Sequence, residues 1–166
     1  MKKFLMAFSF WLLALSSASA QDMKMRDVFR QMPDSLMPYL THNNRLDFID
    51  FLDSNMKAEV KNLLGGTSEM TSLADDSLSI RMSETSKLDL LLLPLLQPVD
   101  SMTQVVVMIE TFVVDSIYGE SQIRYYSPQW LPLQHQPMLS EEQGKRINEH
   151  TLQNILKRDD EVLNKR

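Results

Sequence analysis

Apolar positions along the chain change their period near Gly66. Before it, apolar residues recur at helical spacing and share an arc of roughly 120° on a helical wheel: Phe48, Ile49, Leu52, Met56, Val60 and Leu63. Asn44 is a suitable N-cap, and Gly65 can adopt the left-handed conformation that ends many helices. The pattern predicts a long amphipathic helix from Asn44 to Leu63. A shorter stripe of Met25, Val28, Phe29 and Met32 predicts a helix that ends before Pro33.

Beyond Gly66, polar and apolar residues alternate, which is typical of strands. The alternating or apolar segments are TSEMTSLAD, LSIRMS, KLDLLLLPLL, TQVVVMIETFVVD and QIRYYSPQWLPL. Their connections are short, so they predict an antiparallel meander of about four strands. Proline cannot donate to a ladder, and Pro94 and Pro98 are therefore expected to lie outside it.

The last segment of the chain has the features of a helix. Ser140 and Gln143 form the S-x-x-Q pattern of a capping box. A weak apolar stripe follows, made of Leu152, Ile155, Leu156, Val162 and Leu163. The predicted fold class is thus α+β, with N-terminal helices packed on one face of an antiparallel sheet and a helical tail over residues 140–166. The other face or an edge of the sheet would be available to a partner.

The first twenty residues have the features of a secretory signal peptide. Lys2 and Lys3 precede an apolar run, and Ala18-Ser19-Ala20 fits the small residues that signal peptidase accepts. The run is shorter than the ~20 apolar residues of a membrane span. We therefore expect cleavage after Ala20, a mature chain that begins at Gln21, and one α+β domain over 21–139.

The composition limits which cellular compartments and which classes of partner are compatible with the chain. The chain has no cysteine, which excludes disulfides, thiolate ligands and a lipid-modified cysteine. Without Lys2 and Lys3, 15 of the 17 basic residues remain against 22 acidic ones, a net charge of −7. Such a surface disfavours nucleic acid and anionic lipid. The sequence predicts a periplasmic or secreted protein without membrane insertion, whose partner is an envelope protein, peptide or glycan.

Three aspartates at three-residue spacing, Asp47, Asp50 and Asp53, could bind a hard cation. Calcium loops, however, alternate oxygen donors and contain a glycine turn, whereas apolar residues separate these aspartates. The aspartates are better explained as the polar side of the predicted helix, with Asp53 and Lys57 as an i,i+4 pair. His42, His135 and His150 form no H-E-x-x-H pattern. We assign no metal ligand and expect no cofactor.

Catalytic motifs are equally scarce. The sequence has no G-x-S-x-G, so a serine hydrolase elbow is not indicated. Asp75 and Asp76 could serve as a carboxylate pair for glycoside hydrolysis, but neighbouring residues at the end of a strand point apart. We assign no catalytic residue.

Aromatic residues cluster near the end of the last predicted strand. Tyr125, Tyr126 and Trp130 could stack on a sugar or a peptide at an exposed sheet edge, with Arg124 beside them. The alternative is that the rings are buried against the helices and that Trp130 closes the core. We favour burial, and we keep the four residues as binding candidates.

Four blocks occur in this order: MPDSLMPYL, NNRLDFIDFLDSNMKAEVKNLLGG, SEMTSLADDSL and YYSPQWLPL. Together they resemble an uncharacterised domain-of-unknown-function family of exported proteins from Gram-negative gut and oral bacteria. The resemblance spans roughly Phe29 to Leu133. It implies a compartment and a fold, and it assigns no catalytic residue to any position.

Two functions follow as hypotheses. The first is a non-enzymatic, soluble periplasmic module that binds a ligand or a protein. The second is a carboxylate-dependent hydrolase that acts on envelope polysaccharide or peptide. An enzyme requires a concave site where titratable groups converge, whereas a binding module requires only an exposed complementary surface.

Overall fold

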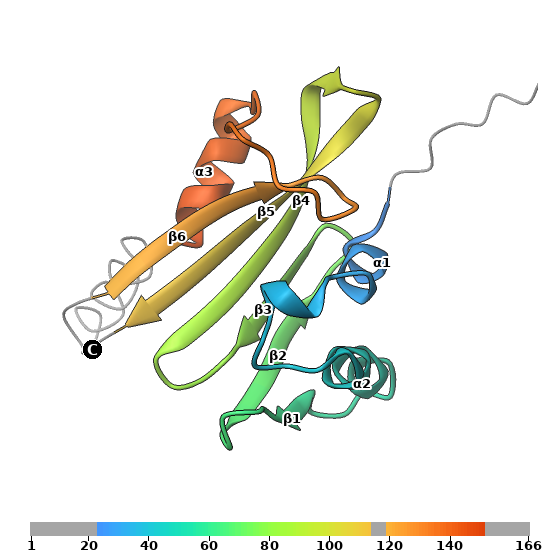
Figure 1. Ribbon diagram of the computed structural model, residues 1–166, viewed down its shortest axis with the longest axis vertical. Coiled ribbons are helices and arrows are strands. Elements are labelled where there is room, and N and C mark those ends of the chain that lie inside the picture. Colours follow the sequence, from blue (N-terminus) through green and yellow to red (C-terminus); the bar gives the residue numbers. More distant parts are fainter. Residues whose placement is uncertain (1–22, 114–118, 152–166) are drawn as a thin grey trace, which may run out of the picture.

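The computed structural model describes residues 23–113 and 119–151 (Figure 1). The helical elements are α1 Met25–Arg30, the 3-10 turn η1 Asp34–Leu36, α2 His42–Asp53 and α3 Glu141–Glu149. The strands are β1 Glu59–Lys61, β2 Thr67–Leu73, β3 Ser77–Arg81, β4 Ser86–Val99, β5 Met102–Val113 and β6 Gly119–Tyr126. The predicted signal peptide, and the part of the predicted tail beyond Thr151, lie outside these residues.

The strands form one antiparallel sheet in the order β1-β2-β3-β4-β5-β6, so each strand pairs with its neighbour in sequence. The predicted α+β class and the antiparallel meander are confirmed. The expected number of about four strands is wrong, because the described residues form a sheet of six. One of the six, β1, lies in a segment that the sequence pattern assigned to a helix.

The predicted long helix is therefore also wrong in its extent. Its N-cap lies three residues earlier than Asn44, at Thr41, which forms a capping box with Asn44 at position N3. It ends at Asp53, because Asn55 adopts the left-handed conformation with a φ of 55°. Asn55 N–H donates to Leu52 O and Met56 N–H donates to Phe51 O, which is the hydrogen-bond pattern of a Schellman motif. An asparagine thus ends the helix, rather than Gly65.

The residues after this cap form a hairpin. Ala58 and Val60 are buried, whereas Lys57, Glu59 and Lys61 are exposed, so the segment alternates as a strand does. Gly65, with a φ of +81°, lies in the β1–β2 turn, a conformation that glycine adopts without steric cost. The apolar residues Met56 and Leu63, which we expected on the core face of a helix, are exposed.

Helices cover both faces of the sheet rather than one. Figure 1 shows α1, η1 and α2 on one side of the strands and α3 on the other. The capping box of Ser140 and Gln143 begins α3 as predicted. Ile147 of α3 packs with Leu91, Val107 and other apolar residues of the second face, so this face is not wholly available to a partner. We call the two sides of the sheet the α1/α2 face and the α3 face.

The α1/α2 face holds the larger apolar core. Even-numbered strand residues point to it and meet the helices; they include Leu78, Ile80, Leu88, Leu90, Leu92, Val106 and Met108. Phe29 from α1 and Phe48 from α2 are fully buried against them. Arg45 is 1% exposed and donates to the backbone oxygens of Met32 and Leu40, which ties the η1 segment to α2.

Both prolines lie within β4, contrary to the expectation that they would fall outside the ladder. Pro94 is opposite Gln104 of β5, beyond the last residue of β4 that pairs with β3. Leu92 N–H points away from β5, toward Asp76 O, and Pro94 has the same orientation two residues later. The N–H that proline lacks would therefore lie on an outer edge of the sheet. In the part of the chain described, no helix is long and apolar enough to cross a membrane.

Candidate functional site

Two of the predicted binding aromatics are core residues. Trp130 and Tyr126 are each 5% exposed, and their ring centroids are 5.6 Å apart. Trp130 Nε1 donates to Val28 O of α1 at 2.8 Å, so the indole closes the α1/α2 face. Trp130 has a φ of 66°, and the hydroxyl of Ser127 accepts from the backbone N–H groups of Gln129 and Leu131 on either side of it. These contacts agree with the interpretation that we favoured, in which the rings are buried.

The other two candidates, Tyr125 and Arg124, are half-buried and point to opposite faces. Tyr125 packs on the apolar cluster of the α3 face, and burial raises the pKa of its hydroxyl. Arg124 forms an ion pair with Glu110 of the neighbouring strand. The structure therefore does not bring the four predicted residues together as one exposed surface.

A buried polar cluster on the α3 face was not predicted. Its centre is Asp89 of β4, whose side chain is 0% exposed. Ser79 Oγ donates to Asp89 Oδ1, and His150 Nδ1 lies 3.4 Å from the same oxygen. Oδ2 accepts no aligned hydrogen bond, but Lys87 Nζ lies 3.0 Å from it as an ion pair. Burial alone would raise the pKa of Asp89; the contacts with His150, Ser79 and Lys87 outweigh it and hold this pKa below its ordinary value.

This cluster contains the residue types of a hydrolase triad in the wrong order. In a triad the histidine lies between the serine and the aspartate and takes the serine proton. Here the carboxylate of Asp89 lies between Ser79 and His150. Ser79 is also buried, so a substrate could not reach its hydroxyl. The arrangement fastens the end of α3 to the sheet and does not activate a nucleophile.

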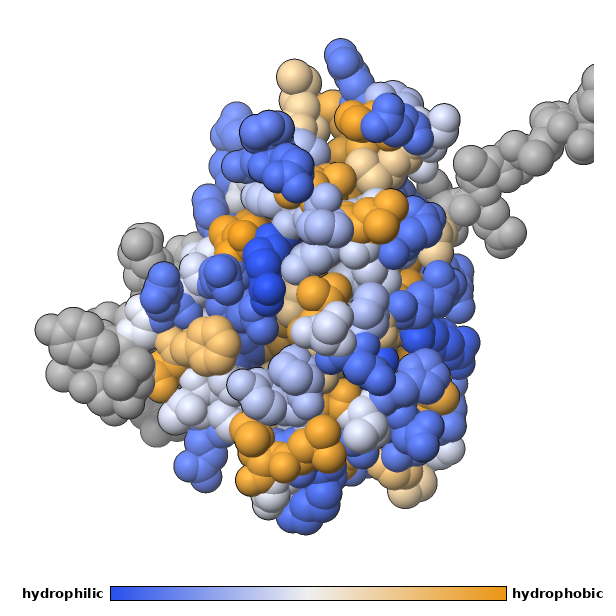
Figure 2. Space-filling model, in the orientation of Figure 1, coloured by the Kyte–Doolittle hydropathy of each residue, from blue (hydrophilic) through white to orange (hydrophobic). Residues whose placement is uncertain are grey.

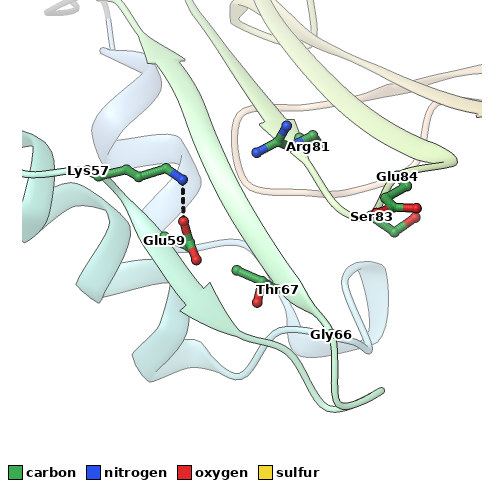
Figure 3. A pocket seen from close by; sticks show the side chains of 7 residues that line it. All are labelled: Lys57, Glu59, Gly66, Thr67, Arg81, Ser83 and Glu84. Carbon is green, nitrogen blue, oxygen red and sulfur yellow. Dashed lines mark ion pairs between the residues drawn. The ribbon is translucent and has the colours of Figure 1, made fainter.

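The same face opens into a polar hollow beside the cluster. It has a volume of ≈ 710 Å³ and is lined by Lys57, Glu59, Gly66, Thr67, Arg81, Ser83 and Glu84. Figure 3 shows the side chains of Lys57 and Glu59 on one side of this space and those of Arg81, Ser83 and Glu84 on the other. The residues come from three strands, two turns and the segment before β1, because odd-numbered positions from Lys57 to β3 share this face.

Ion pairs connect the charged residues of the polar hollow. Lys57 Nζ lies 2.5 Å from Glu59 Oε2 and 3.8 Å from Glu69 Oε2. Arg81 forms an ion pair with the same oxygen of Glu69. Hydrogen bonding to Glu59 raises the pKa of Lys57, and the reciprocal contact lowers the pKa of Glu59. Both groups are thus held in their charged forms.

A second hollow continues the first along the sheet. Its volume is ≈ 310 Å³, and it shares Arg81, Ser83 and Glu84 with the polar hollow. Its far wall includes Lys87, the partner of Asp89. The two hollows are therefore continuous on the α3 face, and Lys87 connects the second one to the buried cluster.

An apolar cleft of ≈ 40 Å³ lies on the opposite side, between the η1 segment and the ends of β4 and β5. Tyr39 and Phe112, which are 44% and 46% exposed, lie at its edge. Figure 2 shows apolar residues in small separate groups among polar ones on the side of the molecule in view. The cleft is too small for a ligand beyond a single side chain.

The carboxylates considered for metal binding and catalysis are engaged elsewhere. Asp53 accepts from Arg26 of α1 at 2.8 Å, rather than pairing with Lys57 as the helical spacing suggested. Asp75 pairs with Lys24 and Asp76 with Arg146, so these neighbours point apart as predicted. Within residues 23–113 and 119–151, no three histidine or acidic side chains gather as a metal would require.

Sequence reasoning missed the residues of the polar hollow and the buried cluster. Lys57 and Glu59 were placed on a helix, although KAEVK alternates polar and apolar residues over five positions. Asp89 stands alone inside the run LDLLLL, and an acidic residue within an apolar strand is a signal of a buried, partnered charge. Each signal extends over only five or six residues, which is too short to outweigh the longer helical pattern or to identify a site.

The fold resembles that of a known structure. A domain of an uncharacterized protein from Porphyromonas gingivalis W83 aligns with a TM-score of 0.56 and 22% sequence identity. The alignment covers 69% of this chain and 58% of that one, so the chain spans little more than half of its structural neighbour. At this identity the likeness concerns the fold alone. No curated protein matches the sequence.

A family profile described as "Protein of unknown function (DUF3256)" matches residues 15–163. The match extends over both faces of the sheet, from before α1 to beyond α3. It includes all four sequence blocks on which the resemblance rested. The chain therefore belongs to the DUF3256 family.

Proposed function

We propose that the protein is a non-enzymatic binding module of the periplasm and that the polar hollow is its ligand site. In this proposal residues 1–20 direct export, and cleavage after Ala20 releases the chain that begins at Gln21. The ligand is a component of the envelope, either a protein or peptide or a glycan. Nucleic acid and lipid are unsuitable, because the chain is acidic overall.

The observation that carries the proposal is the polar hollow itself. A volume of ≈ 710 Å³ is within the range of roughly 300–1,000 Å³ that small-molecule sites occupy. Lys57 and Arg81 keep 62% and 58% of their side-chain surface exposed there. Side chains this exposed add little to packing, so their grouping around a concavity is better explained by ligand recognition.

The pKa shifts support binding over the alternative of a carboxylate-dependent hydrolase. A glycosidase needs a carboxylic acid whose pKa is raised, so that it can donate a proton near neutral pH. Among the described carboxyls with a resolved shift, every pKa lies below its ordinary value: those of Asp53, Glu59, Asp76 and Asp89. Such groups act as fixed anions rather than proton donors.

The test is capture from envelope extract by the wild-type chain and by Arg81→Glu, with Arg30→Glu as the matched control. Arg30 is an exposed, ion-paired arginine of α1, far from the polar hollow in sequence and on the opposite face. Arg81→Glu should lose the captured component, and Arg30→Glu should retain it. Equal capture by all three proteins would refute the assignment of the polar hollow as the site.

The proposed export and the cleavage after Ala20 are tested separately, by mass spectrometry. Intact mass of the protein recovered from the periplasm should equal the mass of residues 21–166. The expectation rests on the small residues Ala18 and Ala20 before the cleavage point. A mass that includes residues 1–20 would contradict it.

A further inference from the structure

Charges of alternating sign follow one another around the polar hollow. Glu59, Lys57, Glu69 and Arg81 form a chain of ion pairs in that order across β1 to β3. Glu84 follows in the turn after β3 and completes the wall. The four charged residues of the lining, Lys57, Glu59, Arg81 and Glu84, therefore sum to zero.

Two members of the wall have unused hydrogen-bonding capacity. Arg81 contacts Glu69 through one terminal nitrogen, which leaves the other N–H groups of its guanidinium for a ligand. Glu84 makes no ion pair with any other residue of the described chain, and its carboxylate is exposed. A guanidinium with N–H groups to spare and a carboxylate without an ion-pair partner among the described residues thus line the same space.

We propose that the polar hollow binds a short peptide by both of its free ends, with the peptide carboxylate on Arg81 and the peptide amine on Glu84. The inference rests on the proposed function, since it names the ligand class of that site. A guanidinium binds a carboxylate through two parallel N–H bonds, and a carboxylate accepts from an ammonium. Lys57 and Glu59 would bind polar side chains of the same ligand.

Other ligand classes are less complementary to this wall. A polyanion would meet Glu59 and Glu84, and a polycation would meet Lys57 and Arg81, so either would place like charges side by side. A neutral glycan usually stacks a sugar ring on an aromatic side chain, and the described lining contains none. A zwitterion leaves no charge of the wall unmatched.

The experiment uses four forms of tri-alanine: unblocked, N-acetylated, C-amidated, and blocked at both ends. Binding is followed at pH 7 through the amide shifts of the ¹⁵N-labelled chain, and the residues that shift should be those of β1 to β3. The unblocked peptide should bind best. Each block should weaken binding roughly threefold to tenfold, as expected for a partly exposed charged contact.

Two variants show which end of the peptide contacts which residue of the polar hollow. In Arg81→Gln, amidation of the peptide should cost no further affinity, and in Glu84→Gln, acetylation should cost none. The matched controls are Arg30→Gln and Glu142→Gln, an exposed arginine of α1 and an exposed glutamate of α3. Both controls should keep the full penalty for each block. The amide spectrum of each variant also shows whether it remains folded.

Each result decides the inference. The inference stands if the two variants remove the two penalties separately. It is overturned if the four peptides bind equally, or if none binds. If no peptide binds but capture from envelope extract still depends on Arg81, the proposed function stands and only the binding of peptide ends is excluded. Capture that is independent of Arg81 would reject both.

Discussion

The two faces of the sheet are built on different principles. On the α1/α2 face, two helices, a 3-10 turn and Trp130 bury one continuous apolar cluster. On the α3 face, a smaller apolar cluster gives way to the buried charge of Asp89 and then to the polar hollow. Both faces belong to the same strands, since alternate residues of β4 and β5 point to each.

This difference between the faces assigns most of the folding stability to the α1/α2 face and ligand recognition to the α3 face. Burial of apolar surface is the main favourable term in folding, and it is concentrated on the α1/α2 face. Exposed ion pairs contribute little to stability, yet they orient charges at a surface. The fold can therefore keep a charged, open face because the opposite face holds it together. Four substitutions test this division, beginning with the largest effect.

Trp130→Ala should destabilise the protein most. The substitution removes a nearly fully buried indole, its contact with Tyr126 and its bond to Val28 O. The expected loss is about 3–5 kcal/mol in the free energy of unfolding, as for other large-to-small changes in a core. Urea unfolding followed by circular dichroism measures it.

The control for this variant is Asp50→Ala, a change on the exposed side of α2. It should cost far less, within about 0.5 kcal/mol. If Trp130→Ala were as stable as the wild type, the ring would not close the core, and the aromatic residues of β6 would again be candidates for ligand binding.

Asp89→Asn should have the next largest effect and should act on the α3 face. Asparagine keeps the shape but removes the charge that Lys87 and His150 contact. We expect a loss of about 1.5–3 kcal/mol at pH 7, the range for hydrogen bonds to a charged group. Urea unfolding at pH 7 measures this loss. A change below about 0.5 kcal/mol would mean that the buried charge is not needed to hold α3.

The same variant predicts a change in acid stability. The pKa of Asp89 is lower in the folded chain than its ordinary value, so the carboxylate stabilises the fold above that ordinary value near 3.8. This contribution is lost as the pH falls through the folded pKa. Urea midpoints at pH 7, 5, 4 and 3 should therefore decline less steeply for Asp89→Asn than for the wild type. Parallel curves would contradict the assignment.

The α1/α2 face shows how far the sequence could predict the fold. The periodicity of Met25, Val28 and Phe29 placed a helix where α1 lies, and long apolar or alternating runs located β2 to β6. The boundary at Asp53 was missed, because Asn55 ended the helix in a conformation for which glycine was expected. Since Phe48, Leu52 and Val60 fit one helical stripe, the apolar pattern alone could not show that Val60 belongs to a strand.

The α3 face shows why the site was harder to predict. Lys57 precedes Arg81 and Glu84 by more than twenty residues, and it meets them only because β1, β2 and β3 pair in one register. Single-sequence periodicity gives the face of each strand but not the register between strands. Trp130 could be placed in the core by its size and apolar neighbours, whereas a group of surface charges carries no local signal of that kind.

Arg146→Gln should have a smaller effect than either buried substitution. Arg146 Nη1 lies 2.7 Å from Asp76 Oδ2, and the pair joins α3 to the β2–β3 turn. Hydrogen bonding to Arg146 is the main cause of the lowered pKa of Asp76. Because both side chains are at least one-third exposed, solvent screens the pair, and we expect a loss of up to about 1 kcal/mol.

The salt dependence of stability tests whether Arg146 and Asp76 stabilise the fold through their charges. The difference between Arg146→Gln and the wild type should shrink when urea unfolding is repeated in 1 M NaCl, where the Debye length is about 3 Å. The difference for Trp130→Ala should not shrink, because it arises from apolar packing. If the cost of Arg146→Gln were independent of salt, packing of its aliphatic stem would explain it better than charge.

Arg81→Gln should change stability least, by no more than about 0.5 kcal/mol, although it removes a cation from the wall of the polar hollow. The side chain of Arg81 is 58% exposed, and Lys57 also lies 3.8 Å from Glu69, so the substitution should leave no buried charge unpaired. Urea unfolding of Arg81→Gln beside Asp89→Asn measures the contrast between an exposed charge and a buried one on the same face. A loss above about 1 kcal/mol would show that the ion-pair chain supports the fold, and reduced ligand binding by the variant could then reflect unfolding. A loss within the expected range separates the two effects, because any change in binding by Arg81→Gln would then arise from the missing guanidinium itself.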